Sequence, residues 1–375
     1  MSSILFSSIA ISNLELRNRI VVAPMCQYSA DNGSMTDWHI MHLGQFAVSG
    51  VGLIFTEAVG VEMAGRISPG CLSLCTDEHE ESFKRVIKFC HDFGNAKMGI
   101  QLAHAGRKGS TELPWLGGKP ISSSEVRGWK TEAPSAIPFA PEGWETPEEL
   151  DQLGLTRIKE AFVSSAIRAD RVGFEFLELH AAHGYLLHQF LSPLSNQRKD
   201  EYGGTLENRM RFPFEVFDAI RKVWPRDKAL GLRLSATDWV ERSSWNLLES
   251  VIFASALAER GCDFIDVSSG GNSPEQEIEV GPGYQTGFAA KIRSESDLPT
   301  MAVGQIVEPK HAEAVLRSGQ ADMISVGRGM LCNPRWAWQA ADSLGDDADY
   351  APQYMRASTS LRGLPIPGNP PVAKN

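Results

Sequence analysis

Two histidines and a tyrosine lie close together near the middle of the chain, in the segment HAAHGY. His180 and His183 are three positions apart, and Tyr185 follows. Two neutral imidazoles can each donate one ring N–H to the same substrate oxygen, and a phenol can supply or accept a proton. We favour this interpretation over a metal site, because zinc usually needs a third His, Asp or Glu ligand and the intervening alanines supply no base. A purely structural histidine pair is the remaining alternative.

Glycines and one arginine near the C-terminus indicate a second kind of chemistry. Gly304 follows one short apolar run, and Gly327, Arg328 and Gly329 follow the next one. Backbone N–H groups at glycines can approach a phosphate closely, and an arginine adds a positive, forked donor. A single glycine would more often only close a turn, but the two segments together favour a phosphate site.

These residues need a scaffold, and the chain offers eight short apolar runs that alternate with helical patterns. Such runs are typical of strands covered on both faces, and the alternation predicts an α/β fold, a closed (β/α)8 barrel or TIM barrel. A doubly wound nucleotide-binding sheet should carry G-x-G-x-x-G after an early strand, whereas Gly50 and Gly52 precede a strand and lack the third glycine. The predicted strands are Ile20–Met25, Val51–Ala58, Met98–Ala103, Phe174–His180, Ala229–Ser235, Phe264–Ser268, Thr300–Val303 and Met323–Val326.

Amphipathic helices are predicted between the strands. Phe83, Val86 and Ile87 recur at three-and-four spacing, as on the buried face of a helix, and several other segments have the same pattern. The predicted helices are Glu78–Phe93, Leu155–Val172, Thr205–Val223, Leu247–Glu259 and Pro309–Leu316.

The remaining segments are predicted to close and extend the barrel. The longest connection contains Arg107–Glu145 and predicts a lid loop after the third strand. The residues before Asn18 predict an N-terminal hairpin that caps the bottom of the barrel. We expect residues 346–375 to form an extended tail at a subunit interface, and residues 1–375 to form one domain.

In barrels of this kind the chemistry lies at the C-terminal ends of the strands. His180 ends the fourth predicted strand, and Gly304 and Gly327 follow the seventh and eighth, which is the usual phosphate corner of the fold. On one regular strand His180 and His183 would face opposite sides. Both therefore reach one ligand only if the strand ends near His180 and the chain then turns.

The composition argues against several classes of partner. The formal net charge is −10 and no run of Lys and Arg occurs, so we do not expect nucleic acid or a membrane as a partner. No apolar run approaches the ~18 residues of a membrane span, and the N-terminus does not resemble a signal peptide. The six cysteines include no C-x-x-C pair and are expected to be reduced thiols of a cytoplasmic protein.

Four longer motifs carry a resemblance to a known family. The chain contains PMCQYSA, QLAHAGRK, HAAHGYLLHQFLSP and RKDEYGGTLENRMRF. Together they resemble the Old Yellow Enzyme family of FMN-dependent reductases, from about Phe6 to about Arg356. The pair Cys26 and Tyr28 is most similar to its bacterial, thermophilic-like subgroup of YqjM-type and xenobiotic reductases. The resemblance implies FMN as the cofactor and NADPH as the hydride donor, with NADH as the alternative.

The resemblance also implies roles for individual residues. His180 and His183 would bind the substrate carbonyl, and Tyr185 would donate a proton while the C=C bond of an enone-like substrate is reduced. Arg356 would reach into the site of a neighbouring subunit, which implies a homodimer or homotetramer. Further residues around the substrate would be Tyr28 and Lys108, and those around the flavin Ala23, Pro24, Met25, Cys26, Ala58, Gln101, Arg233, Gly304, Gly327 and Arg328.

Two other functions compete with the ene-reductase. One is a metal-dependent barrel hydrolase or lyase that uses His180 and His183 as ligands. The other is a non-catalytic flavoprotein that serves as a redox sensor. We expect no metal, because the set of catalytic residues that the resemblance implies is complete. Enones, maleimides, nitroalkenes and nitrate esters would all suit the same site, so the sequence does not single out one substrate.

Overall fold

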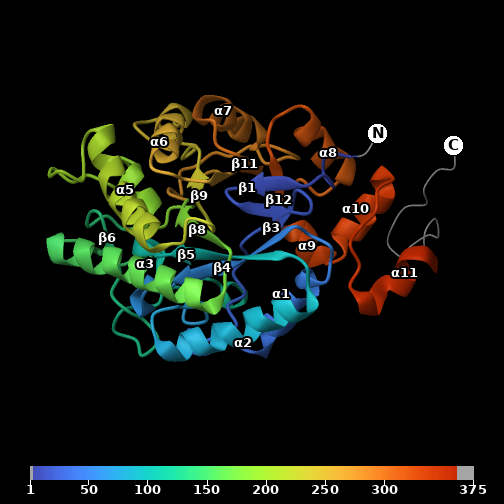
Figure 1. The fold of residues 1–375 in the computed structure, drawn as a ribbon. Coiled ribbons are helices and arrows are strands. Elements are labelled where there is room, and N and C mark those ends of the chain that lie inside the picture. The colour runs from blue at the N-terminus through green and yellow to red at the C-terminus, as the bar shows by residue number, and fades with distance from the viewer. Residues whose placement is uncertain (1–2, 361–375) are drawn as a thin grey trace.

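Eight parallel strands close into a barrel in the computed structural model, which describes residues 3–360 (Figure 1). Their order around the barrel follows their order in the chain, and the last strand pairs with the first. The predicted (β/α)8 barrel is therefore confirmed. The strands are β3 (Ile20–Val22), β4 (Leu53–Gly60), β5 (Lys97–Ala103), β8 (Phe176–Ala181), β9 (Ala229–Ser235), β10 (Phe264–Ser268), β11 (Thr300–Ala302) and β12 (Met323–Val326).

The observed strands differ from the predicted ranges mainly at their ends. Strand β3 ends at Val22, whereas the prediction extended to Met25. Pro24 has no N–H to donate to a neighbouring strand, so the ladder stops before it. Strand β4 instead continues past the predicted end at Ala58, to Gly60.

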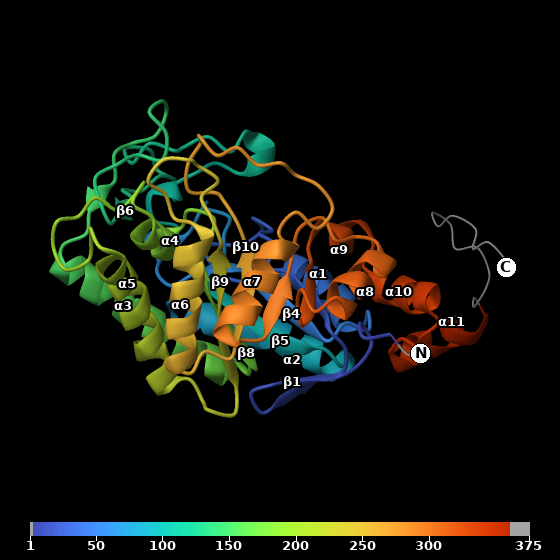
Figure 2. The ribbon, with the colours of Figure 1, turned by 90° about the horizontal axis from the view of Figure 1, so that it is seen from above.

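Helices surround the barrel (Figures 1 and 2). In α2 the predicted apolar face of Phe83, Val86 and Ile87 is buried. Helix α1 was not predicted, because its buried face includes His39 and His42, which weaken the apolar pattern. The helices are α1 (Asp37–Ala47), α2 (Asp77–Phe93), α3 (Gln152–Val172), α4 (Leu186–Leu191), α5 (Leu206–Val223), α6 (Leu247–Glu259), α7 (Thr286–Ser296), α8 (Pro309–Arg317), α9 (Arg328–Cys332), α10 (Trp336–Leu344) and α11 (Met355–Ser360).

Apolar side chains fill the lower part of the barrel interior. The ring of Phe264 lies 6.1 Å from that of Phe55 and 5.8 Å from that of Phe176, measured between centroids. Gly99 and Gly231 leave space for these rings, because a Cβ atom at either glycine would lie 2.5 Å from a phenylalanine ring. The interior is thus packed at this level and leaves no room for a ligand.

The predicted N-terminal hairpin is confirmed. Strands β1 (Ile9–Ile11) and β2 (Leu14–Leu16) pair antiparallel, and Ile11 and Leu16 pack on the apolar cluster inside the barrel. Figure 2 shows β1 at one end of the barrel and the long loops at the opposite end. The hairpin therefore closes the bottom and leaves the C-terminal ends of the strands as the open mouth.

The long connection between β5 and α3 lies at the mouth (Figure 2). The Arg107 guanidinium ties its start to the loop after β10, because it donates a hydrogen bond to the Asn272 carbonyl at 2.8 Å. A role as a lid stays a prediction. The short elements in this connection are η2 (Gly106–Lys108), η3 (Pro114–Leu116), β6 (Glu132–Ala133) and β7 (Glu148–Glu149), and a further 3-10 turn, η1 (Met63–Gly65), follows β4.

The extended tail predicted for residues 346–375 is wrong for part of that range. A 3-10 turn, η4 (Pro352–Tyr354), leads into α11, which lies beyond α10 in Figure 1. Proline at the first position of a helical turn has its fixed φ already suited to a helix. Residues 361–375 lie outside the described residues. In the described part of the chain, no helix is long and apolar enough to cross a membrane.

Candidate functional site

The chain turns sharply just beyond β8, as the histidine pair requires. The strand ends at Ala181, and His183 (φ +58°) and Gly184 (φ +74°) follow in the left-handed region. As a result the rings of His180 and His183 lie 5.1 Å apart at nearly a right angle, and the Tyr185 ring lies 4.9 Å from that of His180. The three predicted catalytic side chains are therefore brought together.

Two other loops hold this turn in place. The Lys108 ammonium donates hydrogen bonds to the carbonyls of His183, at 2.8 Å, and Gly271, at 2.7 Å. Burial, assisted by the charge of Arg107, lowers the pKa of Lys108 to about 7. A Cβ atom on Gly184 would lie 2.3 Å from the Gly271 carbonyl oxygen, so only glycine fits at this contact.

A buried histidine and aspartate support the same turn from below. His188 Nδ1 accepts a hydrogen bond from the Gly184 N–H at 2.9 Å. Its Nε2 lies 3.0 Å from Asp238, and neither side chain is exposed. Because Nδ1 is an acceptor, the neutral ring carries its hydrogen on Nε2, which is close to the carboxylate but not aligned for a hydrogen bond with it.

Both histidines at the mouth are held neutral. Burial lowers the pKa of His180 and of His183 well below the usual value, and the charge of Arg233 lowers both further. His180 Nδ1 accepts a hydrogen bond from the Ala182 N–H at 3.3 Å, so its hydrogen lies on Nε2 and is available to a ligand. His183 Nε2 already shares a hydrogen bond of 2.7 Å with the Ser268 hydroxyl.

The phenol of Tyr185 is held protonated. Burial is the main cause that raises its pKa well above the usual value, and the nearby thiol of Cys26 adds to the effect. A phenol that keeps its hydrogen next to two neutral imidazoles can act as a proton donor. The site therefore combines two uncharged hydrogen-bond groups with one weak acid.

A cavity of about 540 Å³ lies at the ends of β3, β10, β11 and β12, and its wall includes Ser268, the hydrogen-bond partner of His183. The predicted phosphate residues Gly304, Gly327 and Arg328 line one part of it, and Arg233 lines another. Both arginine charges act on Tyr284, where they oppose the rise in pKa that burial causes. The other lining residues are Ala23, Pro24, Met25, Pro282, Gln285, Val303, Gln305, Ile306, Val307, Ser325, Val326, Gly329 and Leu331.

The predicted flavin neighbours on β4 and β5 lie inside the barrel. Ala58 and Gln101 are partners in the register of the two strands and are 5% and 1% exposed. The Gln101 amide donates a hydrogen bond to a Glu178 oxygen at 2.7 Å. Gln101 is therefore held in one orientation by a carboxyl group that the sequence analysis did not single out.

Cys26 and Tyr28 follow β3 in a loop that a buried carboxylate anchors. Glu57 accepts a hydrogen bond from the Gln27 N–H at 3.1 Å and lies 3.2 Å from His39 Nε2. Burial raises the pKa of Tyr28, and its ring contacts that of Trp115 edge-on with centroids 5.9 Å apart. Tyr28 thereby connects the loop after β3 to the long connection at the mouth.

The last predicted site residue, Arg356, lies on α11 and is exposed. Its predicted entry into a neighbouring subunit's site stays a prediction. Tyr284 and Gln285 of the cavity wall were not predicted from the sequence, because they precede α7 in a stretch without regular spacing. Glu178 and Asp266 were not predicted either, although each stands two positions before a mouth residue on its strand, a spacing that places both residues on the same face.

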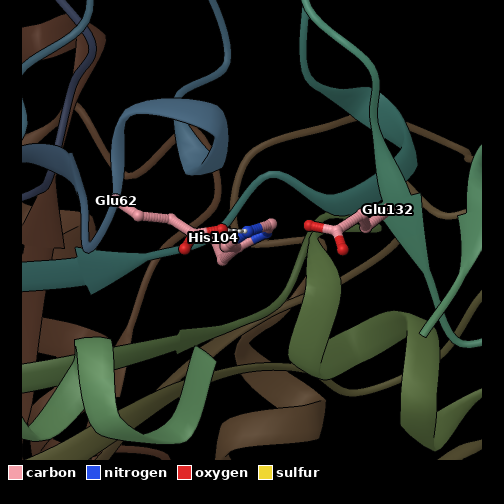
Figure 3. Close-up of side chains that lie close together, drawn as sticks. All are labelled: Glu62, His104 and Glu132. Carbon is pink, nitrogen blue, oxygen red and sulfur yellow. Dashed lines mark hydrogen bonds and ion pairs between the residues drawn. The ribbon is translucent and has the colours of Figure 1, made fainter. Parts of the chain in front are cut away.

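One group of side chains in residues 3–360 has the spacing of metal ligands. Ligand atoms of Glu62, His104 and Glu132 lie within 4.8 Å of one another (Figure 3). His104 Nδ1 accepts a hydrogen bond from the Gly106 N–H at 3.1 Å, so the hydrogen of the neutral ring lies on Nε2, 3.0 Å from Glu62. The nitrogen that faces the carboxylates therefore has no lone pair to offer a metal.

Arg157 supplies the positive charge that these carboxylates need. Its guanidinium lies 3.5 Å from Glu62 and 2.5 Å from Glu132. The cluster is thus explained as an ion-pair network. Neither His180 nor His183 has a third ligand group beside it in the described part of the chain, which argues against the metal-dependent alternative.

A family model, curated relatives and solved structures all indicate the same kind of protein. Residues 4–347 match the family described as NADH:flavin oxidoreductase / NADH oxidase. The chain is 43% identical to an NADPH dehydrogenase of Geobacillus sp. (strain WCH70), covering 95% of this chain and 99% of the relative, and 41% identical to that of Bacillus subtilis (strain 168), with the same coverage. The fold is similar to that of morphinone reductase, with a TM-score of 0.75 and 27% identity over 94% of this chain and 93% of that one.

The lowered histidine pKa values predict how stability depends on pH. In the unfolded chain a histidine binds a proton below about pH 6.5, whereas His180 and His183 stay neutral in the folded protein. The unfolded state then binds more protons, so the free energy of unfolding should fall as the pH decreases below that value. Chemical denaturation over a pH series and NMR titration of the rings measure this.

The variant His183→Asn serves as the control, because it removes one of the two groups. Its free energy of unfolding should fall less steeply with acidification than that of the wild type. A titration midpoint near 6.5 for either ring in the folded protein would contradict the prediction.

Proposed function

Because the chain belongs to the NADH:flavin oxidoreductase / NADH oxidase family, also called the Old Yellow Enzyme family, we propose that it is an FMN-dependent ene-reductase. It would reduce the C=C bond of α,β-unsaturated carbonyl compounds and related activated alkenes. One observation carries this proposal above all. The neutral rings of His180 and His183 and the protonated phenol of Tyr185 converge beside a cavity with a glycine-rich, cationic corner.

The cavity suits FMN in its chemistry. Gly304 has φ of +132° and Gly327 has no side chain, so backbone groups in this corner are accessible to a phosphate. Two arginines bring positive charge to different parts of the same cavity. Arg328 is exposed, whereas Arg233 is buried deeper in the barrel. The Ala23–Cys26 segment, Ala58 and Gln101 would hold the ring system, and when bound FMN would supply the hydride.

The protein's own residues would then handle charge and protons. Hydride addition to an enone moves negative charge onto the carbonyl oxygen, where the His180 Nε2–H would donate a hydrogen bond. His183 would donate a second one after exchanging its partner Ser268 for the substrate. Loss of one such donor typically costs about 3–4 kcal/mol of transition-state stabilisation. Tyr185 would protonate the α-carbon, because its phenol keeps its hydrogen.

The electron donor is proposed to be NADPH, which is the substrate in the name of both bacterial relatives. The sequence contains no dinucleotide fingerprint, so the donor would occupy the same mouth as the alkene and leave before the alkene binds. NADPH oxidation coupled to cyclohexenone reduction would separate this enzyme from a flavin-containing redox sensor.

We expect the purified protein to bind FMN and to show flavin absorbance. The variant Arg328→Gln should bind FMN more weakly by roughly tenfold to a hundredfold, because a hydrogen bond to a charged group contributes about 1.5–3 kcal/mol. Isothermal titration of the flavin-free protein measures the affinity.

The control is Arg260→Gln, because Arg260, just after α6, pairs with Asp218 of α5 outside the barrel, with an N–O distance of 3.0 Å. Its FMN affinity should equal that of the wild type. A folded protein that refuses FMN would overturn the proposed function, and equal affinities for the two variants would remove Arg328 from the phosphate site.

The variant Tyr185→Phe should slow alkene reduction by about 10²–10⁴-fold, the range that general acids contribute, and leave flavin reduction by NADPH nearly unchanged. Anaerobic stopped-flow absorbance follows the two half-reactions separately, so the reduction step is an internal control. Equal slowing of both half-reactions would argue against proton donation by Tyr185.

We also propose that the protein forms a homodimer or homotetramer through the face that bears α11. Met355 and Tyr354, next to Arg356, have 60% and 45% of their surface exposed, and large exposed apolar side chains are often covered by a partner. Sedimentation velocity should show a multiple of the chain mass, and Met355→Glu should shift it toward the monomer. A wild-type monomer at micromolar concentration would refute this proposal.

A further inference from the structure

Two carboxyl groups and one guanidinium are buried inside the barrel, between the phenylalanine floor and the mouth. Glu178 on β8 and Asp266 on β10 are completely buried, and Arg233 on β9, between them in the sheet, is 6% exposed. The Arg233 Nε atom lies 3.2 Å from an Asp266 oxygen. The cluster therefore contains one cation, Arg233, and two carboxyl groups that are usually anionic.

The hydrogen bonds of this cluster do not balance if both carboxyls are ionised. Glu178 Oε1 accepts a hydrogen bond from the Gln101 amide at 2.7 Å, but Glu178 Oε2 accepts none from the described residues. Neither Asp266 oxygen has a hydrogen-bond donor in that part of the chain. A buried charge without hydrogen-bond partners is costly, so two ionised carboxylates with one donor between them are not a stable arrangement.

We propose that Glu178 keeps its proton in the folded protein and donates it in a hydrogen bond to the Asp266 carboxylate. The single O–H gives the free Glu178 oxygen a role and supplies a donor to Asp266. Asp266 remains the anion that balances Arg233, so the cluster has no net charge. No other group has to change its protonation.

The barrel geometry allows this contact. Side chains from alternate strands share one layer inside a (β/α)8 barrel, and β8 and β10 are alternate strands on either side of β9. The β9 residue in register with Glu178 is Gly231, which puts no side chain in between.

The charges around the two carboxyls distinguish which of them holds the proton. Burial raises the pKa of Glu178 well above its usual value, and the charge of Asp266 raises it further. Burial also raises the pKa of Asp266, and the charge of Arg233 opposes the rise at both carboxyls. Asp266 has the direct ion pair, whereas Glu178 has a neutral amide as its near neighbour, so the proton belongs to Glu178.

Glu178 is in this view a positioning residue for the proposed flavin site. Its carbonyl oxygen fixes the orientation of the Gln101 amide, and its hydroxyl orients the carboxylate that holds Arg233. Gln101 and Arg233 are expected neighbours of the flavin ring, so the positioning role of Glu178 rests on the proposed function. The protonation of Glu178 itself does not depend on it.

Infrared spectroscopy tests the protonation directly. The wild type should show the C=O stretch of a protonated carboxyl at neutral pH, and uniform ¹³C labelling of glutamate should move it. The band should be absent from Glu178→Gln. A spectrum without such a band, or a band moved by aspartate labelling in place of glutamate labelling, would overturn the proposal. Labelling assigns the band to a glutamate, and loss of the band in Glu178→Gln, or in Glu178→Leu if the first variant fails to fold, separates Glu178 from buried Glu57, whose pKa is also raised.

Two isosteric variants give a second test in the FMN-loaded enzyme. The amide introduced by E178Q would accept from Gln101 and donate to Asp266 as the protonated acid does, so this variant should keep the wild-type flavin midpoint potential and melting temperature. D266N removes the true anion, and it should raise the midpoint potential and lower the melting temperature. Glu178→Leu should also lower the melting temperature, because it cannot replace the hydrogen bonds.

An E178Q potential that is raised as far as that of D266N would mean that Glu178 is charged, and the proposal would be wrong. Failure of the proposed function has a different signature. A protein that binds no FMN but shows the glutamate carboxyl band would refute the flavin site and leave the protonated Glu178 intact.

Discussion

The geometry of the site depends on two hydrogen bonds that the Lys108 ammonium donates. The acceptors are the carbonyls of His183 and Gly271, so Lys108 holds the left-handed turn after β8 against the loop after β10. Without that turn, two histidines at this spacing would point to opposite faces of a strand. His188 holds the same turn through the Gly184 N–H. Three loops at the mouth therefore have to be in place before the two imidazole rings can lie side by side.

The barrel interior changes its chemistry from the bottom to the mouth. Phenylalanines fill the bottom, a buried layer with Arg233 and Asp266 follows, and the neutral histidines stand above it. The order has an electrostatic consequence, because the Arg233 charge lowers the pKa of both His180 and His183. Burial is the main reason that both rings stay neutral, and the nearby Arg233 charge favours the same uncharged form, which donates hydrogen bonds. The same arginine lines the proposed flavin cavity, so it serves both halves of the site.

The local patterns predicted much of the scaffold for clear physical reasons. Strands β9, β10 and β12 begin and end where predicted, because continuous apolar runs with turn residues at both ends have few alternatives in a parallel barrel. Helix α1 was missed, because it buries His39 and His42 and so lacks the apolar period on which prediction relies. The tail was misjudged, because a Pro-rich composition does not exclude a helical turn that begins at proline.

By itself, the sequence determined the parallel barrel, its hairpin cap, the glycine-rich corner and the identity of the histidines and tyrosine. These follow from residue types and short-range periodicity. Only the tertiary structure decided that Glu178 and Asp266 lie buried around one arginine, and that His104 belongs to an ion-pair network without a free lone pair for a metal. Such facts depend on contacts between strands and loops far apart in the chain, where burial and neighbouring charges set protonation, and no local pattern records them.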